Sequence, residues 1–153
     1  MKKQKCILVD LDNCLLDISH RTHLFKRNKK GVPNWSTCMK LAHKDKFNYN
    51  VQDILWRIFC WDLDQEIVYI STRPEKYRNV TAKILGYRKN ESSKNSLYLA
   101  KNGETRDDVI VKKELLKKIQ KKYKVVVAIE DRKIVCDMYR KQGIFTLDIA
   151  GND

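Results

Sequence analysis

The feature that most constrains this chain is an apolar run that leads directly into two carboxylates, over residues 6–13 (CILVDLDN). A short run rich in β-branched residues and bounded by polar ones is typical of a strand buried on both faces of a parallel sheet. Open α/β folds carry their chemistry at the carboxyl ends of such strands. We therefore expect Asp10 to end the strand as a nucleophile, and Asp12 to begin the loop as a proton carrier in the same crevice.

Similar apolar runs recur along the chain and alternate with helical patterns. Strand-like runs occupy residues 7–10, 67–71, 97–99, 125–129 and 144–149. Apolar residues at helical spacing mark residues 51–59, 74–86, 111–119 and 134–143, with glycines at two of the expected helix ends. This alternation predicts parallel strands joined by right-handed crossovers, and hence a doubly wound α/β sheet within one domain, residues 1–153.

The connection from Asp12 to Glu66 is longer than the other connections and has room for two or three helices. Its less regular part, residues 17–50, is too short for an independent domain. We interpret that part as a small helical cover over the strand ends; it contains His20, Arg21, His23 and Trp35.

Composition narrows the class of protein. No run approaches the length of a membrane span, and five cysteines without CxxC spacing argue against a disulfide framework or a zinc site. We therefore expect a reduced, cytoplasmic protein with no membrane partner. The net charge of +13 has two interpretations, a lysine-rich solvated surface or attraction to nucleic acid, and charge alone leaves both open.

The second strand ends in polar groups, Ser71, Thr72 and Arg73, just before an expected helix start at Pro74. A hydroxyl, a guanidinium and the free N–H groups of a helix start together form an anion site. The alternative is that Ser71 or Thr72 caps the helix, and this alternative is the commoner one for such a segment taken alone.

Two adjacent acids, Glu130 and Asp131, follow the fourth strand. Crowded carboxylates favour a neutralising cation, and with Asp10 they offer the oxygen ligands that Mg²⁺ prefers. The alternative is an acidic helix start. Lys112, on the first turn of a preceding helix, is by itself one of several lysines that solvent would be expected to surround.

Taken in order, Asp10-Leu11-Asp12-Asn13, Ser71, Lys112 and Glu130-Asp131 resemble the four motifs of the haloacid dehalogenase (HAD) superfamily of phosphotransferases. The likeness is closer to the 3′-phosphatase domain of phage-type polynucleotide kinase-phosphatases, and four stretches carry it: residues 17–21, 69–75, 106–112 and 130–140. It implies a Rossmann-like HAD fold with a mostly parallel five-stranded sheet and a small helical cover inserted after the first strand.

The resemblance also implies a mechanism. Asp10 would attack phosphorus to give an aspartyl-phosphate, Asp12 would carry the proton, and Ser71 and Lys112 would hold phosphoryl oxygens. Mg²⁺ would be held by Asp10, the backbone carbonyl of Asp12, and Asp131. The remaining roles are substrate binding by Arg21, Thr72 and Arg73, and support by Asn13, Asp108 and Glu130, with Asp108 steadying Lys112 across one helical turn.

The implied activity is removal of 3′-phosphates from DNA or RNA ends, an end-processing reaction of nucleic-acid repair. No GxxxxGK[ST] segment occurs, so we expect the phosphatase module without a P-loop kinase. Two residues depart from the family pattern: Cys14 replaces a usual threonine and Thr72 a usual glycine. Two alternatives stay open, a phosphatase of mononucleotides or small metabolites, and a catalytically silent nucleic-acid-binding module.

Overall fold

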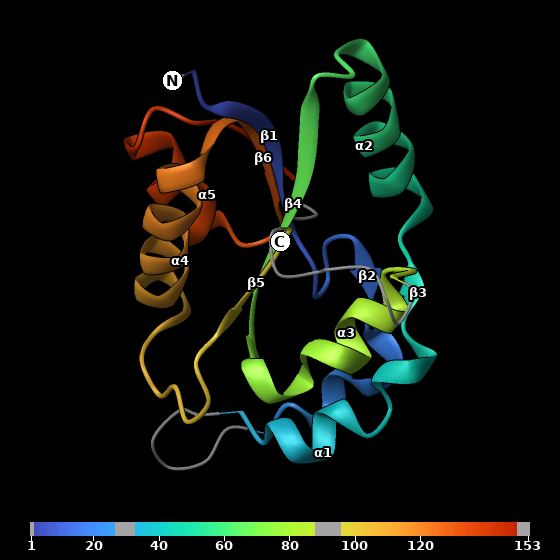
Figure 1. The fold of residues 1–153 in the computed structure, drawn as a ribbon. Coiled ribbons are helices and arrows are strands. Elements are labelled where there is room, and N and C mark those ends of the chain that lie inside the picture. Colours follow the sequence, from blue (N-terminus) through green and yellow to red (C-terminus); the bar gives the residue numbers. More distant parts are fainter. Residues whose placement is uncertain (1, 27–32, 88–95, 150–153) are drawn as a thin grey trace.

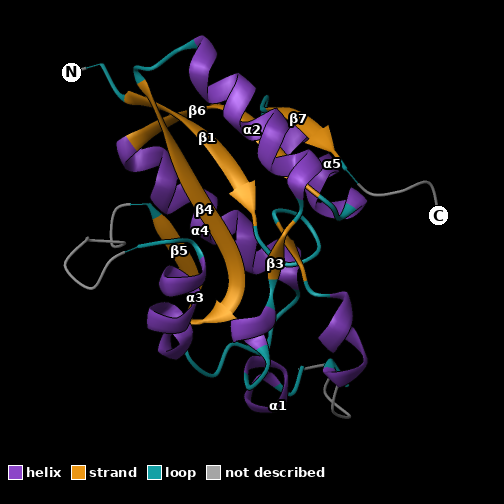
Figure 2. Ribbon diagram, turned by 90° about the vertical axis from the view of Figure 1, so that its right-hand side faces the viewer, coloured by secondary structure: helices purple, strands orange, loops and turns teal. Residues whose placement is uncertain are grey.

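The computed structural model describes residues 2–26, 33–87 and 96–149. At its centre is a five-stranded sheet of order β5-β4-β1-β6-β7, in which every pair of neighbours is parallel. Figure 2 shows β1 and β4 running in the same direction. The chain builds one side of the sheet and then crosses to the other, which confirms the doubly wound fold. The strands are β1 (Gln4–Asp10), β4 (Gln65–Pro74), β5 (Leu97–Ala100), β6 (Tyr123–Glu130) and β7 (Phe145–Asp148).

Helices cover both faces of this sheet (Figure 1). On one face, α4 (Asp108–Lys122) and α5 (Lys133–Lys141) pack against Cys6 and Leu8 of β1. On the other, α2 (Tyr49–Trp61) packs against Ile7 and Val9. Because alternate side chains of a strand point to opposite faces, a strand buried on both faces must be apolar throughout. This is the physical reason for the apolar run at the start of the chain.

The same alternation positions Asp10. It shares a face with Cys6 and Leu8, so its side chain points toward α4. Lys112 lies on the buried side of α4 with Leu115, Leu116 and Ile119, because these positions follow helical spacing. Lys112 is therefore buried, and not one of the solvated lysines of α4.

A turn after β1 brings the second carboxylate to the same place. Asn13 adopts a positive φ of 61°, a conformation that asparagine tolerates better than most residues. Its N–H donates to the carbonyl of Leu16 at 3.0 Å, which closes the turn. The backbone thus reverses immediately after Asp12.

The cover lies beyond the carboxyl ends of the strands, at the lower end of the molecule in Figure 1. It contains the 3₁₀ helices η1 (Ser19–Leu24) and η2 (Ala42–Lys44) and the helix α1 (Trp35–Met39). It also contains an antiparallel pair, β2 (Leu16–Asp17) and β3 (Lys46–Phe47), which the prediction of helices alone missed. Two-residue strands carry too little periodicity to be recognised in a sequence.

One predicted helix start is wrong. We expected a helix from Pro74, but Pro74 has the extended dihedrals φ −61° and ψ 144° and pairs with Ala100 as the last residue of β4. The 3₁₀ helix η3 (Glu75–Tyr77) and α3 (Arg78–Ile84) follow, and Gly86 ends the segment at φ +85°. The fixed φ of proline suits either structure, and pairing with β5 decides between them. No helix in the described ranges is both long and apolar enough to cross a membrane.

Candidate active site

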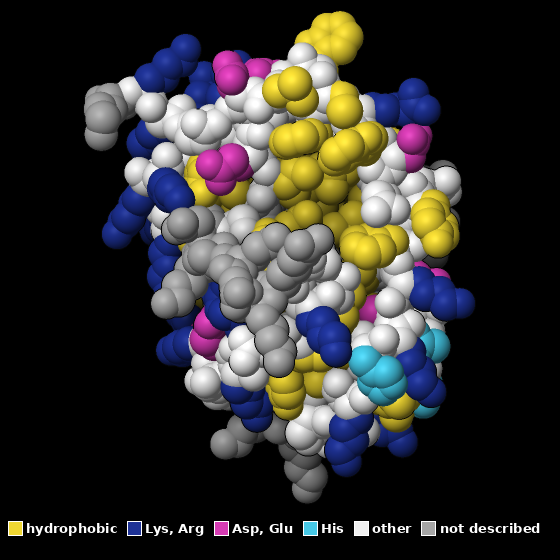
Figure 3. All heavy atoms as spheres, turned by 45° about the vertical axis from the view of Figure 1, so that its right-hand side comes forward, with side chains coloured by type: hydrophobic (Ala, Val, Ile, Leu, Met, Phe, Trp, Pro, Cys, Tyr) yellow, Lys and Arg dark blue, Asp and Glu magenta, His cyan; other side chains and the backbone are white. Residues whose placement is uncertain are grey.

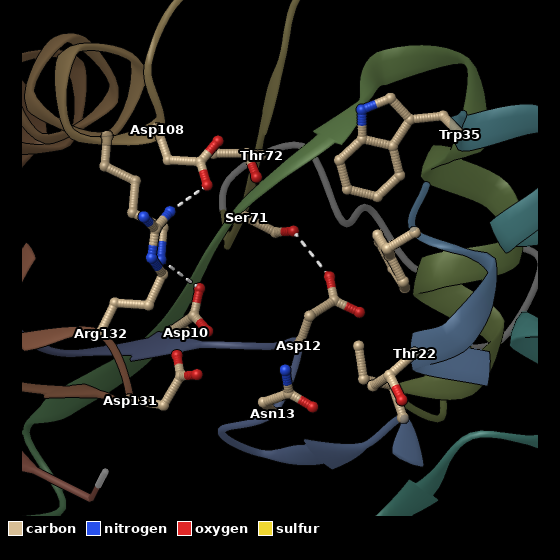
Figure 4. Close-up of a pocket in the computed structure, with 13 residues that line it drawn as sticks. Asp10, Asp12, Asn13, Thr22, Trp35, Ser71, Thr72, Asp108, Asp131 and Arg132 are labelled. Atoms are coloured by element: carbon tan, nitrogen blue, oxygen red, sulfur yellow. Dashed lines mark hydrogen bonds and ion pairs between the residues drawn. The ribbon is translucent and has the colours of Figure 1, made fainter. Parts of the chain in front are cut away.

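A cavity of about 260 Å³ opens at the carboxyl ends of the strands, between the sheet, α4 and the cover (Figure 4). Most of the residues proposed from sequence meet here, although they are scattered along the chain from residue 10 to residue 131. Those that line the cavity are Asp10, Asp12, Asn13, Ser71, Thr72, Asp108, Lys112 and Asp131.

Asp10, Glu130, Asp131 and Lys112 form what we call the acidic cluster. One carboxylate oxygen from each of its three acids lies within 4.8 Å of the other two. The Lys112 Nζ donates to Asp10 Oδ1 at 2.6 Å and to Glu130 Oε2 at 2.7 Å. One ammonium group therefore bonds to two of the three carboxyl groups and is the only positive charge within the cluster, which leaves the cluster short of positive charge.

The three acids of this cluster have raised pKa values, first because they are buried and then because they lie close together. Burial, followed by the charge of Glu130, raises the pKa of Asp10 to about 7. Burial and then the charge of Asp10 raise the pKa of Asp131 to about 6. Burial also raises the pKa of Glu130. For Lys112 burial acts in the opposite direction, but the charges of Asp10 and Glu130 outweigh it and hold its pKa well above the ordinary value.

The acidic cluster fits a divalent cation. Within the described part of the chain, Asp131 Oδ1 is buried and has no hydrogen-bond partner. A buried carboxylate oxygen without a partner costs free energy that a cation would recover. Carboxylate oxygens are also the ligands that hard cations such as Mg²⁺ prefer. Glu130 joins Asp10 and Asp131 in this arrangement, as the pair of adjacent acids suggested, whereas the family resemblance implied only a supporting role for it.

Asp12, Asp45, Arg21 and Arg73 form a second group, the arginine cluster. Arg73 holds Asp12 with two hydrogen bonds, Nε to Oδ2 at 2.9 Å and Nη2 to Oδ1 at 2.6 Å. Arg21 Nη2 adds a bond to Asp12 Oδ1 at 3.0 Å. Both guanidinium groups also bind the buried carboxylate of Asp45, at 2.6 to 2.9 Å. Two acids and two bases thus neutralise one another.

This arrangement has the opposite effect on Asp12. Burial alone would raise the pKa of Asp12, but the charge and hydrogen bonds of Arg73, followed by the charge of Arg21, lower it. The two arginines therefore favour the ionised form of the carboxyl group that we expected to carry the proton.

The two arginines are placed differently from what the sequence suggested. We expected Arg21 and Arg73 to bind substrate phosphate, but both are fully buried and neither lines the cavity. Their donors are directed at Asp12 and Asp45 instead. Arg73 also reaches Thr81 Oγ1 at 3.3 Å.

The side chain of Asp108 pairs with a residue other than the one that we expected it to support. We expected it to steady Lys112, but it pairs with Arg132 at the rim of the cavity (Figure 4), while Lys112 binds Asp10 and Glu130. The cap of α4 is Asp107, which accepts a hydrogen bond from the Val109 N–H at 2.9 Å.

The alternative explanations by helix capping are not supported. The residue before η3 is Pro74 and the residue before α5 is Arg132, and neither makes a side-chain cap hydrogen bond. Ser71 instead donates to Asp12 Oδ2 at 3.4 Å, and its Oγ accepts from the Arg73 N–H at 3.1 Å.

Asp45 could not be recognised from the sequence, because it is a single acid in an irregular segment. Arg132, Phe25, Thr22 and Ile18 line the cavity without having been proposed for it, and Trp35 had been noted only as part of the cover. Periodicity cannot reveal the residues of the cover, which is built largely of short 3₁₀ turns and two-residue strands, or Arg132, which lies in the connection between β6 and α5.

Known structures contain chains that are similar to this one. Two solved structures, titled "Structure of the Pnkp1/Rnl/Hen1 RNA repair complex" and "Structure of Pnkp1/Rnl/Hen1 complex", contain similar chains, each 26% identical to this one, with TM-scores of 0.73 and 0.72. The matches cover 99% of this chain but only 44% and 47% of those chains, so this chain spans less than half of their length.

No curated protein matches the chain. A family model for the phosphatase domain of polynucleotide kinase PNKP matches residues 4–153. The chain therefore belongs to the HAD-type phosphatase domains of the polynucleotide kinase PNKP family.

Proposed function

We propose that this protein is a Mg²⁺-dependent phosphomonoesterase that removes 3′-phosphates from the ends of DNA or RNA through an aspartyl-phosphate. The observation that carries the proposal is the acidic cluster: a nucleophile candidate, Asp10, lies against a buried lysine and two further carboxyl groups at the edge of an open cavity. Family membership and the net charge of +13 support a polyanionic substrate.

Asp10 attacks phosphorus in line, the ester P–O bond breaks, and the phosphoryl group is left on the Asp10 carboxylate. Lys112, whose Nζ lies 2.6 Å from Asp10 Oδ1, favours the ionised form of Asp10 and provides positive charge for a phosphoryl oxygen. Ser71 and Thr72 line the same side of the cavity and supply hydroxyl donors. Asp10, Asp131 and the Asp12 backbone carbonyl would hold Mg²⁺, with Glu130 beside them. When bound, the ion offsets the repulsion between a carboxylate and a phosphate dianion.

Asp12 transfers the proton. A bound phosphate ester brings negative charge next to this carboxyl group and raises its pKa, so that it can hold a proton for the departing 3′ oxygen. In the second half of the reaction, Asp12 takes a proton from the water that hydrolyses the aspartyl-phosphate. The bonds from Arg21 and Arg73 fix the direction of the carboxylate throughout, and the two arginines act as positioning residues.

The test is release of inorganic phosphate from a 3′-phosphorylated oligonucleotide, a 5′-phosphorylated one and a free nucleotide, each with Mg²⁺ and with a chelator. We expect release from the 3′-phosphorylated end that stops on chelation and returns when Mg²⁺ is restored. Release from the free nucleotide alone would overturn the polynucleotide assignment. Salt-sensitive DNA binding without release from any substrate would favour a silent binding module.

A further inference from the structure

One wall of the cavity has no part in the chemistry proposed above. Phe25 and Trp35 of the cover and Ile18 are apolar residues that line the cavity. Figure 4 shows Trp35 across the cavity from Asp10 and Asp131. Phosphoryl transfer needs charge and hydrogen bonds, so an aromatic wall must serve the rest of the substrate. We propose that Trp35, supported by Phe25, is the platform on which the base of the 3′-terminal nucleotide stacks. This inference rests on the proposed function.

The two rings form a fixed unit. Their centroids are 5.6 Å apart and their planes meet at 83°, so the edge of one ring packs on the face of the other. Such edge-to-face pairs are favourable because of the ring quadrupoles. Both side chains are half-buried, and each still lines the cavity. The pair therefore combines a supported ring with an open surface.

The aromatic unit is also tied to the catalytic groups. The guanidinium carbon of Arg21 lies 5.4 Å from the Phe25 ring centroid, within the range of a cation–π contact. The same guanidinium group holds Asp12 and Asp45. The position of the wall relative to Asp12 is thus set by one buried side chain.

The helix that carries Trp35 is anchored separately. Asn34 caps α1 by accepting a hydrogen bond from the Thr37 N–H at 3.3 Å. The thiol of Cys38 donates to the Leu24 carbonyl at 3.1 Å, which joins α1 to η1. Trp35 and Phe25 are therefore held by elements that contact each other.

A nucleoside fits such a wall better than a sugar phosphate does. The body of a sugar phosphate consists mainly of hydroxyl groups, which would lose their hydrogen bonds to water against Ile18 and Trp35. A nucleobase instead presents a flat π-face. Because every base has one, stacking predicts tolerance of the terminal base identity, and it contributes roughly 1–3 kcal/mol per base.

Trp61 provides a matched control. It is 92% exposed and lies at the end of α2, beside a separate apolar groove that includes Val127, Phe145 and Leu147. Figure 3 shows apolar side chains gathered over this part of the surface. Trp61 precedes the first residues of β4, at the opposite end of the strand from Ser71, so its removal should not affect the cavity.

The experiment compares two 3′-phosphorylated oligonucleotides that differ only in the terminal residue, a normal nucleotide or a tetrahydrofuran abasic residue. With the normal end, we expect Trp35→Ala to lower kcat/KM by roughly 5- to 150-fold, mainly through KM, which corresponds to ~1–3 kcal/mol for a stacked base. On the abasic end the variant should equal the wild type. Trp35→Phe should restore most of the loss, and Trp61→Ala should change neither substrate.

Equal loss on both substrates would assign Trp35 a structural role, and no loss on either would exclude the platform. A binding measurement keeps the inference separate from the proposed function. In an Asp10→Asn protein with Trp56→Phe and Trp61→Phe, Trp35 is the only tryptophan. Its fluorescence should be quenched by the normal end and not by the abasic end. Quenching without turnover in the wild type would retain the platform and reject the phosphatase. Turnover without quenching would retain the phosphatase and reject the platform.

Discussion

Asp10 and Asp12 are two residues apart, yet the two clusters that contain them are built on opposite principles. In the acidic cluster three carboxyl groups share one lysine charge, and the pKa of Asp10 is raised to about 7. In the arginine cluster two guanidinium groups serve two carboxylates, and the pKa of Asp12 is lowered. Most side chains of both clusters are buried, and burial acts to raise the pKa of both Asp10 and Asp12. The opposite directions of the two pKa shifts therefore come from the balance of charge and not from burial.

This comparison indicates a division of labour. A cluster short of positive charge is ready to accept a cation, whereas a neutral cluster gains nothing from one and instead fixes geometry. The acidic cluster is thus suited to bind Mg²⁺ and the phosphoryl group, and the arginine cluster to hold the proton carrier and the aromatic wall. The four predictions that follow test this division.

The largest effect is expected from Asp10→Asn, which removes the nucleophile from the acidic cluster. Turnover of a 3′-phosphorylated oligonucleotide should fall by on the order of 10⁴-fold or more, as when other covalent nucleophiles are removed. The amide is similar in size, so the urea-unfolding midpoint should show a folded protein. Asp53→Asn, at an exposed acid of α2, is the control and should keep full activity. Wild-type turnover by the Asp10 variant would mean that another group attacks phosphorus.

Breaking the arginine cluster should mainly cost stability. Arg73→Met leaves the partly buried carboxylate of Asp12 and the buried carboxylate of Asp45 with Arg21 as their remaining guanidinium partner. Loss of one member of a buried ionic group costs about 3–5 kcal/mol of the free energy of unfolding. The exposed pair of Arg57 and Asp53, at i,i+4 spacing, provides the control, and Arg57→Met should cost no more than ~0.5 kcal/mol. Similar urea denaturation curves for the two variants would remove the structural role of Arg73.

The same contrast explains how far the sequence could be interpreted. The strands and the acidic cluster were predictable, because two-sided burial leaves an apolar run and the chemistry follows directly at its end. The arginine cluster was not. Arg21 and Arg73 are residues of the type that binds phosphate. Only the fold shows that both donate hydrogen bonds to Asp45, which the cover places beside them. Long-range pairing between charged residues leaves no periodic signal in one sequence.

Mg²⁺ should stabilise the folded protein by binding to the acidic cluster and should not bind to the arginine cluster. A ligand that binds only the folded state at 100 times its Kd adds about 2.7 kcal/mol, so the wild-type melting temperature should rise when Mg²⁺ is added. Asp131→Asn should abolish that rise. Asp45→Asn should start from a lower melting temperature and keep the rise, because it damages only the arginine cluster. An unchanged Mg²⁺ response in the Asp131 variant would place the cation elsewhere.

The smallest effect is expected at Cys14, which lies in the turn that follows Asp12. A thiol here, where the family usually has threonine, suggests sensitivity to oxidation, but Cys14 is fully buried and its thiol donates to the Ile129 carbonyl at 3.6 Å. Of the five cysteines only Cys60 is exposed. Because a thiol reagent needs access to the sulfur, the native protein should show one rapidly reacting thiol, keep its phosphatase activity, and lose the rapid reaction on Cys60→Ser. A rapidly reacting thiol in the Cys60→Ser protein, whose modification abolishes turnover, would show that solvent reaches the backbone behind Asp10. The fixed geometry assigned to both clusters would then be wrong.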